Sequence, residues 1–242
     1  MINSTNEDSF SFIVPAYNPG AFLFDHILAL LAVLQTTGYL YEVIVVDDGS
    51  TDGSIESLHQ IQNSSLKIRH HKHNQGKGAA IKTGFSSASM SWIGFIDADG
   101  DIPASCILPL INVAIKESPD IILGSKSLKQ SDIHSSFYRK ILSKSFQLAV
   151  RSLFKLPVKD TQTGLKLFKR TVVTTLEPYL KENGYAFDLE FVVLANQLGF
   201  RNIVEVPVKI LKRRSSTLSY RQVIHVASDT LRVFLRLKKT KL

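Results

Sequence analysis

Three carboxylates at alternate positions form the pattern in this chain that most suggests chemistry. They are Asp97, Asp99 and Asp101, and the small residues Ala98 and Gly100 between them leave room for a ligand. Ionised carboxylates this close repel one another, and a divalent cation among them relieves the repulsion. Hard oxygen ligands favour Mg²⁺ or Mn²⁺, and Mg²⁺ usually keeps waters and substrate phosphates as its other ligands. The alternative is an acidic turn that caps the next helix.

A second acidic pattern lies earlier in the chain. The apolar residues 92–96 before the first pattern predict a buried strand, and another expected strand, 41–46, leads directly into Asp47 and Asp48. Ligands of open α/β sheets bind at the carboxyl ends of the strands, so both acidic groups are expected at one edge of a sheet. Helix capping explains Asp47 poorly, because that residue is still on the strand.

Hydrophobic runs and turn residues place these acids in an alternating series of strands and helices. The expected strands are 10–14, 41–46, 66–70, 92–96, 120–124, 165–169 and 201–212. The expected helices are 21–36, 52–62 with Ser50 or Thr51 as its cap, one from 76–80 to about 88, 103–117, 137–154, 185–199 and 219–237. The alternation predicts an α/β fold with a mostly parallel, doubly wound sheet and helices on both faces.

The net charge of +8 is divided unequally along the chain. Residues 1–125 contain 6 Lys/Arg and 13 Asp/Glu, a balance of −7, whereas residues 126–242 contain 23 and 8, a balance of +15. The basic half calls for an anionic partner such as phosphates or a lipid surface, although a solvated basic face has the same composition. The basic residues lack interleaved aromatic residues for base stacking, which argues against nucleic acid.

Two expected helices, 137–154 and 219–237, combine an apolar stripe with basic residues and suit an anionic membrane surface. Packing on the core with a solvated face is the alternative for each helix. No run of about 18 apolar residues predicts a membrane span, and the acidic start does not resemble a signal peptide. The single cysteine, Cys106, favours a reducing compartment. We therefore expect a cytoplasmic protein, peripheral at the inner face of a membrane.

Six segments, in a fixed order, resemble family 2 glycosyltransferases of the GT-A fold. They are VPAYN (14–18), VVDDGSTD (45–52), NQGKGAA (74–80), DADGD (97–101), DTQTGLKLF (160–168) and FDLE (187–190). Each segment is weak evidence alone, but the ordered set spans most of the chain and is specific. The subgroup that it resembles is the polyprenyl-phosphate sugar transferases, of the dolichol-phosphate mannose synthase and dolichol-phosphate glucosyltransferase type.

The resemblance implies an inverting, metal-dependent transfer of a hexose from a UDP- or GDP-sugar to a polyprenyl phosphate, dolichyl or undecaprenyl. Its metal and catalytic residues would be Asp97 and Asp99, completed by Asp101. Its donor-binding residues would be Pro15, Tyr17, Val45, Asp47, Asp48, Lys77 and Ala98. Its acceptor- or phosphate-binding residues would be Lys126, Gln162, Arg213, Arg214 and Ser216. The catalytic domain would cover 1–212. Residues 213–242 would extend it as a basic segment that contacts the acceptor, followed by an amphipathic helix.

The acceptor decides whether a general base is needed. A lipid phosphate is already an anion near neutral pH, whereas a sugar hydroxyl requires a base, for which Asp188 and Glu190 are the candidates. Both acids also fit the first turn of a helix, where the helix dipole favours them. The alternatives to a lipid acceptor are a saccharide hydroxyl in cell-surface glycan synthesis, a nucleotidyltransferase of similar fold, and a non-catalytic basic module.

Two departures from the family pattern leave the donor open: Pro19 replaces a usual Glu, and Lys126 replaces a frequent Arg. The glycines at 76 and 78 are expected to let a backbone or a phosphate approach, with Lys77 supplying positive charge. The histidines at 70, 71 and 73 are expected to be ordinary surface residues rather than a metal site.

Overall fold

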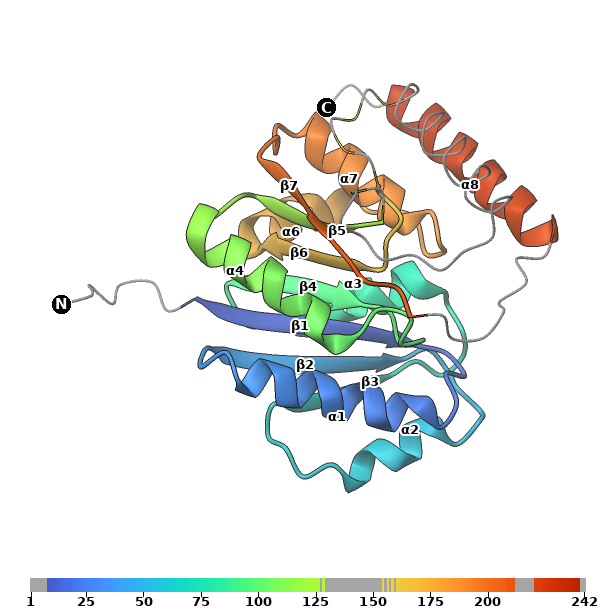
Figure 1. Cartoon of the computed structure of the whole chain (residues 1–242). Helices are drawn as coiled ribbons and strands as arrows, with labels where there is room; N and C mark the ends of the chain where they lie inside the picture. The colour runs from blue at the N-terminus through green and yellow to red at the C-terminus, as the bar shows by residue number, and fades with distance from the viewer. Residues whose placement is uncertain are drawn as a thin grey trace.

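A seven-stranded sheet lies at the centre of the computed structural model, and helices cover both of its faces (Figure 1). The structure describes residues 8–126, 128, 154, 156, 158, 160–211 and 220–239, and within the last helix it describes side chains at 228–237. The strands are β1 (Ser9–Ala16), β2 (Leu40–Asp47), β3 (Leu66–His70), β4 (Trp92–Ile96), β5 (Ile121–Ser125), β6 (Leu165–Lys169) and β7 (Ile203–Pro207). The α-helices are α1 (Phe22–Gln35), α2 (Ser54–Ser57), α3 (Lys77–Ser87), α4 (Ile107–Glu117), α6 (Arg170–Leu176), α7 (Phe187–Gln197) and α8 (Tyr220–Lys239). Short 3₁₀ helices are η1 (Leu58–Gln60), η2 (Ala104–Cys106) and η3 (Glu177–Tyr179).

One strand of the sheet, β6, runs against the other six. The strand order is β3-β2-β1-β4-β6-β5-β7, and neighbouring strands are parallel except where β6 pairs with β4 and β5. This confirms the expected mostly parallel sheet, and β7, with its Pro207, lies at an edge. In the reversed pairing, Leu165 of β6 is opposite Ile96, the last residue of β4. The segment that precedes β6 therefore lies next to Asp97, the residue that follows β4.

The alternation of side chains along the strands divides the core into two clusters. On one face, Phe10, Phe12 and Val14 pack with α1 and α4, and on the other face Ile13 packs with α3, α6 and α7 (Figure 1). The close approach of α3 requires Gly84, because a Cβ there would overlap the Ile13 side chain. Dense packing on both faces fixes the strand ends, and with them the acids that follow the strands.

Some elements differ from the expectations. The expected helix over 52–62 is only the short α2 followed by η1. The Oδ1 atom of Asp52 accepts a hydrogen bond from the Ser54 N–H at 3.1 Å, so the expected caps Ser50 and Thr51 are wrong. The helix α6 was not expected, because its sequence RTVVTTL is short and rich in β-branched residues, which favour strands. The expected strand over 201–212 is confirmed only within β7.

The expected basic amphipathic helix over 137–154 lies outside the described residues except for Phe154, which is helical and packs edge-on against Phe234 of α8. The basic loop with Arg213, Arg214 and Ser216 also lies outside them. Within the described part of the chain, no helix has the length and hydropathy that a membrane crossing requires.

The last helix, α8, lies beside α7 (Figure 1). Its Val233 and Leu237 are buried in the core cluster on that face of the sheet. Leu231 and Leu235, one helical turn apart, are 55% and 51% exposed, and the Arg232 side chain is also exposed. The helix therefore packs on the core through one face and carries an exposed apolar strip on another. The packing confirms the core alternative for this helix, and binding to a membrane surface stays a prediction.

Candidate active site

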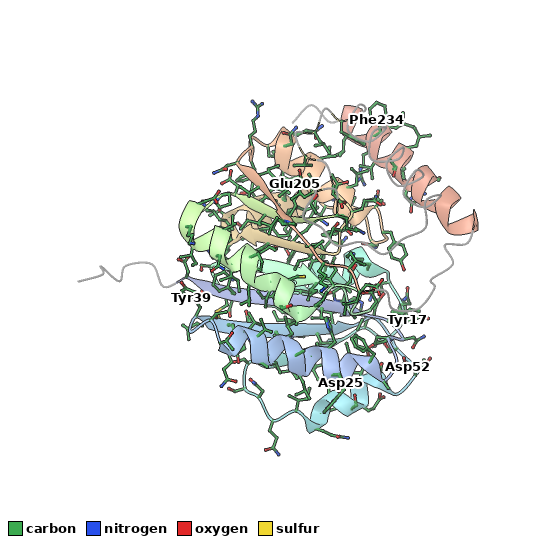
Figure 2. The ribbon with its side chains drawn as sticks, viewed as in Figure 1. Tyr17, Asp25, Tyr39, Asp52, Glu205 and Phe234 are labelled. Carbon is green, nitrogen blue, oxygen red and sulfur yellow. The ribbon has the colours of Figure 1, made fainter. Side chains whose placement is uncertain are left out.

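The carboxyl ends of the parallel strands meet at one edge of the sheet, and the acidic residues gather there. Asp47 is the last residue of β2, and Asp97 follows the last residue of β4. Figure 2 labels Tyr17 and Asp52 in the loops at this edge and Tyr39 at the opposite one. The two acidic groups recognised in the sequence are therefore brought to the same edge, as expected.

Four charged side chains form a connected network at the end of β4. The ammonium of Lys77 lies 2.7 Å from Asp97 Oδ1 and 3.0 Å from Asp188 Oδ2. The other oxygen of Asp188 pairs with the ammonium of Lys166, which also donates to the Thr163 carbonyl at 2.7 Å. The residues come from β6 and the starts of α3 and α7, and from the residue after β4. The tertiary fold therefore brings four residues that are far apart in the sequence, between positions 77 and 188, into a single charged centre.

Burial and charge act against each other in this network. Burial alone would lower the pKa of Lys77, but Asp188 and Asp97 outweigh it and raise that pKa. Burial alone would raise the pKa of Asp188, but Lys166 and Lys77 outweigh it and hold that pKa below its ordinary value. The pKa of Asp97 is raised by burial and by the charges of Asp188 and Asp99, even though Lys77 opposes the rise. Asp97 is thus the member whose negative charge is least compensated.

The three alternating aspartates do not form the expected three-carboxylate cluster. Among the described residues, no group of three or more His, Cys, Asp or Glu side chains is arranged to hold a metal ion. Asp99 is exposed, and its Oδ1 atom accepts the N–H of Asp101 at 3.0 Å. The turn at 99–101 uses one oxygen of Asp99 to accept the Asp101 amide, and the expectation that the Asp101 carboxylate completes the cluster stays a prediction.

Asp97 and Asp99 still fit a divalent cation. Asp97 is a partly exposed carboxylate in excess negative charge, and Asp99 is exposed two residues later. A pair of carboxylates is a sufficient protein contribution for Mg²⁺, which takes waters and substrate phosphates as its remaining ligands. These two residues would hold the ion, and a cation there would offset the burial and the neighbouring acids that raise the pKa of Asp97.

Gly164 is a site residue that sequence reasoning did not single out. A Cβ at this position would overlap the carboxylate of Asp97, and the Gly164 carbonyl accepts the Asp97 N–H at 2.9 Å. The absence of a side chain is what lets the segment before β6 pass against Asp97. Lys166 was also missed, although a lysine inside an apolar strand run is a signal, because lysine is rarely buried without a partner.

Asp47, at the end of β2, is held by hydrogen bonds rather than by lysines. Its Oδ1 atom accepts the Ser50 N–H at 2.8 Å, and its Oδ2 atom lies 3.1 Å from Nδ1 of His70. Burial would raise the pKa of Asp47, but the hydrogen bonds from Ser50 and the contact with His70 hold it below its ordinary value. The Asp47 side chain is therefore a well-positioned ionised acceptor. It pairs across the sheet with Ala16, the residue before the exposed Tyr17.

Three other expected donor-binding residues are Pro15, Val45 and Ala98. The side chains of Val45 and Ala98 are buried in the core cluster that includes α1 and α4, and only their backbone is in a position to face a nucleotide. Pro15 lies in β1 opposite Val46 of β2 and is partly exposed. Of this group, Tyr17 has an exposed side chain, whereas the Asp47 side chain is largely buried.

Asp48 has both of its carboxylate oxygens occupied. Oδ1 accepts from the Gln75 N–H at 2.9 Å and from His71 Nδ1 at 2.7 Å, and Oδ2 accepts from the Gly76 N–H at 2.8 Å. The other ring nitrogen of His71 lies 2.8 Å from the Thr83 hydroxyl. Asp48 therefore holds the loop that leads into α3, and so acts on the position of Lys77 at the start of that helix.

The glycines before and inside α3 accommodate a backbone, as one of the two expected possibilities. A Cβ on Gly78 would lie 2.7 Å from the Glu182 carbonyl oxygen, and the N–H of Gly78 donates to the Asn183 carbonyl at 2.6 Å. Gly76 has φ of 100° and packs against the same carbonyl. The start of α3 is thus fixed to the turn before α7, which sets Lys77 opposite Asp188.

The expected acceptor residues Lys126 and Gln162 are brought together by a buried acid, Asp160. The N–H of Lys126 donates to Asp160 Oδ2 at 3.0 Å, and the N–H of Gln162 donates to Asp160 Oδ1 at 3.0 Å. The Thr163 hydroxyl donates to Oδ2 at 2.7 Å. These bonds shape the loop at 160–164, between the end of β5 and the start of β6. Because the resemblance predicts that this loop faces the acceptor, it is hereafter called the acceptor loop.

The two acids considered as general bases are separated by the structure. Asp188 is bound in the lysine network, whereas Glu190, two positions later on α7, lies on another side of the helix. Glu190 accepts the N–H groups of Lys181 and Glu182 at 2.9 and 2.8 Å and pairs with Arg236 of α8. Burial raises the pKa of Glu190, although these partners oppose the rise. Its contacts tie α8 to α7, so we expect a positioning function for it.

Comparison with known proteins shows what the chain is similar to. The sequence profile "Glycosyl transferase family 2" matches residues 11–176. The dolichyl-phosphate beta-glucosyltransferase of Dictyostelium discoideum is 31% identical over an alignment of 242 residues that covers 93% of this chain and 74% of the relative. The relative of the same name from Drosophila melanogaster is 35% identical over 205 residues, which cover 78% of this chain and 63% of the relative.

Among solved structures, glucosyl-3-phosphoglycerate synthase from Mycobacterium tuberculosis has a similar fold. Its complex with Mn²⁺, UDP and glucosyl-3-phosphoglycerate matches with a TM-score of 0.71 and 18% identity over 95% of this chain and 79% of that one. Its complex with Mn²⁺, UDP-glucose and phosphoglyceric acid gives a TM-score of 0.72 and 18% identity, with 94% and 80% covered. At this identity the comparison shows the fold, which confirms the expected GT-A architecture.

Proposed function

The chain belongs to glycosyl transferase family 2, and we propose that, as a glycosyltransferase, it moves a hexose from a nucleotide-diphosphate sugar to a polyprenyl phosphate. The observation that carries this proposal is the similarity, over most of the chain, to relatives named dolichyl-phosphate beta-glucosyltransferases. Their name supports glucose as the sugar, and the UDP complexes of the structural neighbour support UDP over GDP.

The donor would lie along the carboxyl edge of the sheet, with its nucleoside at the end of β2 and its diphosphate at the end of β4. Asp47 would be an ionised acceptor for the N–H groups of a base or the hydroxyls of a ribose, and Tyr17, one residue after its strand partner Ala16, is exposed. Asp48 would act indirectly, because its oxygens hold the loop before Lys77. Pro15, Val45 and Ala98 would shape the site through their backbone.

Asp97 and Asp99 would hold Mg²⁺ or Mn²⁺ together with the donor diphosphate. When bound, such an ion neutralises negative charge that develops on the leaving nucleoside diphosphate. Lys77, which lies 2.7 Å from Asp97, is positioned to add a second positive charge at the same place. The acceptor phosphate would approach from the acceptor loop, where Lys126 and Gln162 lie, with Arg213, Arg214 and Ser216 of the basic segment as further expected contacts.

The state of the two candidate bases supports a phosphate acceptor over a sugar hydroxyl. Asp188 has a lowered pKa and is bound by two lysines, so it is a poor proton acceptor. Glu190 is paired with Arg236 and with backbone N–H groups. A phosphate is already ionised near neutral pH and attacks the anomeric carbon without either residue, which is consistent with direct displacement and inversion.

The test is a transfer assay with purified protein, Mn²⁺ and a panel of radiolabelled UDP- and GDP-sugars. Dolichyl phosphate, undecaprenyl phosphate and a saccharide acceptor are supplied in separate reactions, and label is measured in the organic and aqueous phases. We expect label in the organic phase, release of nucleoside diphosphate, and loss of both in Asp99→Asn. Label on the saccharide would support the hydroxyl acceptor. Pyrophosphate release in a separate reaction that contains a nucleoside triphosphate and a hexose 1-phosphate would support a nucleotidyltransferase.

We also propose that the protein binds the cytoplasmic face of a membrane through α8 and the basic segment before it. The exposed pair Leu231 and Leu235 lies beside the exposed Arg232, as expected for a helix on an anionic surface. Flotation with vesicles containing anionic lipid should recover the wild type and lose the Leu231→Ser/Leu235→Ser variant. Equal recovery of both proteins would contradict a membrane function for this strip.

A further inference from the structure

Lys166 is a buried cation that the proposed chemistry does not use. It lies in β6 between β4 and β5 and is 1% exposed. Its ammonium binds Asp188 and the Thr163 carbonyl and lies 5.1 Å from the centre of the Phe95 ring. An ammonium in the middle of a sheet is expensive to desolvate, so these contacts must compensate for the loss of water.

The contacts of Lys166 close a ring that joins the acceptor loop to Asp97. From Lys166 the ring passes to Asp188, to Lys77 at 3.0 Å from Asp188, and to Asp97 at 2.7 Å from Lys77. It returns through the Asp97 N–H, which donates to the Gly164 carbonyl at 2.9 Å, one residue from the Thr163 carbonyl that Lys166 holds. The carboxylate for the cation and the acceptor loop are thus fixed to each other twice, once through the backbone and once through charges.

The other end of this loop carries Gln162, which Asp160 holds by its N–H. We propose that Lys166 is a positioning residue that couples the acceptor loop to Asp97, so that the acceptor and the diphosphate are held at a fixed separation. The inference rests on the proposed function, because it takes the acceptor loop as the acceptor site. It deepens that function by naming the residue that sets the geometry between the two substrates.

A merely structural ion pair has different consequences from a positioning residue. If Lys166 only neutralised the buried Asp188, its removal would lower stability and leave the substrate constants of the folded enzyme unchanged. If Lys166 couples the two sites, its removal changes both the acceptor KM and the Mn²⁺ concentration that the enzyme needs. The first depends on the acceptor loop and the second on Asp97, and both belong to the ring. The two cases are therefore distinguished by constants measured on folded protein.

The experiment compares Lys166→Met with Lys169→Met, the same change at the last residue of the same strand. Lys169 binds the Ser118 carbonyl at the opposite end of β6 and is a matched control outside the site. Two quantities are measured. The first is the acceptor KM in the transfer assay. The second comes from melting temperatures measured at a constant UDP concentration with increasing Mn²⁺, and is the Mn²⁺ concentration at which half of the maximal rise in melting temperature is reached. We expect both to rise about tenfold in Lys166→Met, as for neighbouring groups in one network, and neither to rise in Lys169→Met.

A lower melting temperature with both constants unchanged would overturn the proposal. If Lys166→Met does not fold, Lys166→Met/Asp188→Asn removes both charges of the pair and keeps the contact of Lys77 with Asp97. Wild-type constants in that double variant would also overturn the coupling. The thermal shift does not depend on transfer, so failure of the proposed acceptor would appear as an inactive wild type and leave the Mn²⁺ comparison intact.

Discussion

The carboxylates at the end of β2 and those at the end of β4 are bound by different kinds of donor. Asp47 and Asp48 accept hydrogen bonds from backbone N–H groups and imidazoles. Asp97, together with Asp188, is held by the ammonium groups of Lys77 and Lys166. The first arrangement fixes geometry, whereas the second balances charge.

This difference matches what each end would bind. Backbone N–H groups are directional and cannot leave, so they position Asp47 for the fixed hydrogen-bonding groups of a nucleoside. Ammonium groups on flexible side chains can exchange one anion for another, so Lys77 would exchange Asp97 for a donor diphosphate if a cation were bound to Asp97. The following predictions test whether the hydrogen bonds at the end of β2 fix the geometry of the site, and whether the ion pairs at the end of β4 balance its charge.

The largest effect is expected for Asp97→Asn. It removes the charge that would hold the cation, and we expect transfer to fall by about 10²–10³ or more, as for loss of a group that stabilises developing charge. Stability should not fall in EDTA, because burial and the neighbouring acids raise the pKa of Asp97, so its ionised form is held at a cost. The rate and the melting temperature in EDTA are measured, with the partly buried Asp120→Asn as control. A marked loss of stability would show that Asp97 has a structural function.

Asp188→Asn should be the most destabilising change in the charge network. It leaves Lys77 and Lys166 without their shared partner, and removal of one member of a buried ion pair costs about 3–5 kcal/mol. The measurement is urea unfolding of wild type and variant at several pH values.

The pH dependence follows from the direction of the Asp188 shift. Its pKa is lowered in the folded protein, so its contribution is fully present above the unfolded value of about 3.9 and is lost as the pH falls through the folded value. The difference between wild type and Asp188→Asn should therefore be constant from neutral pH down to about pH 5 and shrink only in stronger acid. A difference that already disappears near neutral pH would mean that Asp188 is not ionised in the network.

Asp48→Asn tests the hydrogen bonds at the end of β2. The amide retains one acceptor oxygen, so at least one of the N–H groups of Gln75 and Gly76 loses its partner, at about 1–3 kcal/mol. Because the loop carries Lys77, we expect the donor KM to rise about fivefold while kcat stays within about threefold. The control is Asp25→Asn in the exposed first turn of α1 (Figure 2). An unchanged donor KM would separate Asp48 from the donor site.

The smallest effect on the rate is expected for Glu190→Gln. Its carboxylate accepts backbone N–H groups and pairs with Arg236, so we expect kcat per folded molecule to stay within about twofold and stability to fall by about 1–3 kcal/mol. Glu182→Gln, which changes another carboxylate that pairs with Arg236, is the matched control. A loss of kcat without unfolding, seen only in Glu190→Gln, would restore Glu190 as a general base and with it the hydroxyl acceptor.

Sequence patterns located the acids because their signals are local. An apolar run followed directly by Asp97 or Asp47 predicts a carboxylate at a strand end, and the GT-A architecture agrees with that prediction. Nothing local distinguishes Asp188 from Glu190, since both occupy the first turn of one helix. Their partners, Lys166 and Arg236, come from β6 and α8, and a sequence pattern does not report such long-range pairs.

The sequence by itself determined the alternation of elements and the acidic strand ends, because each depends on spacing over a few neighbouring residues. It also determined the family, through six segments in a fixed order along most of the chain. The tertiary structure decided which hydrogen-bond donors and which cationic side chains lie next to each carboxylate. The reversed β6 brings Gly164 against Asp97 and places Lys166 next to Asp188. The physical reason is that the cost of a charge depends on burial and on the opposite charges around it, and both are set only when distant segments pack together.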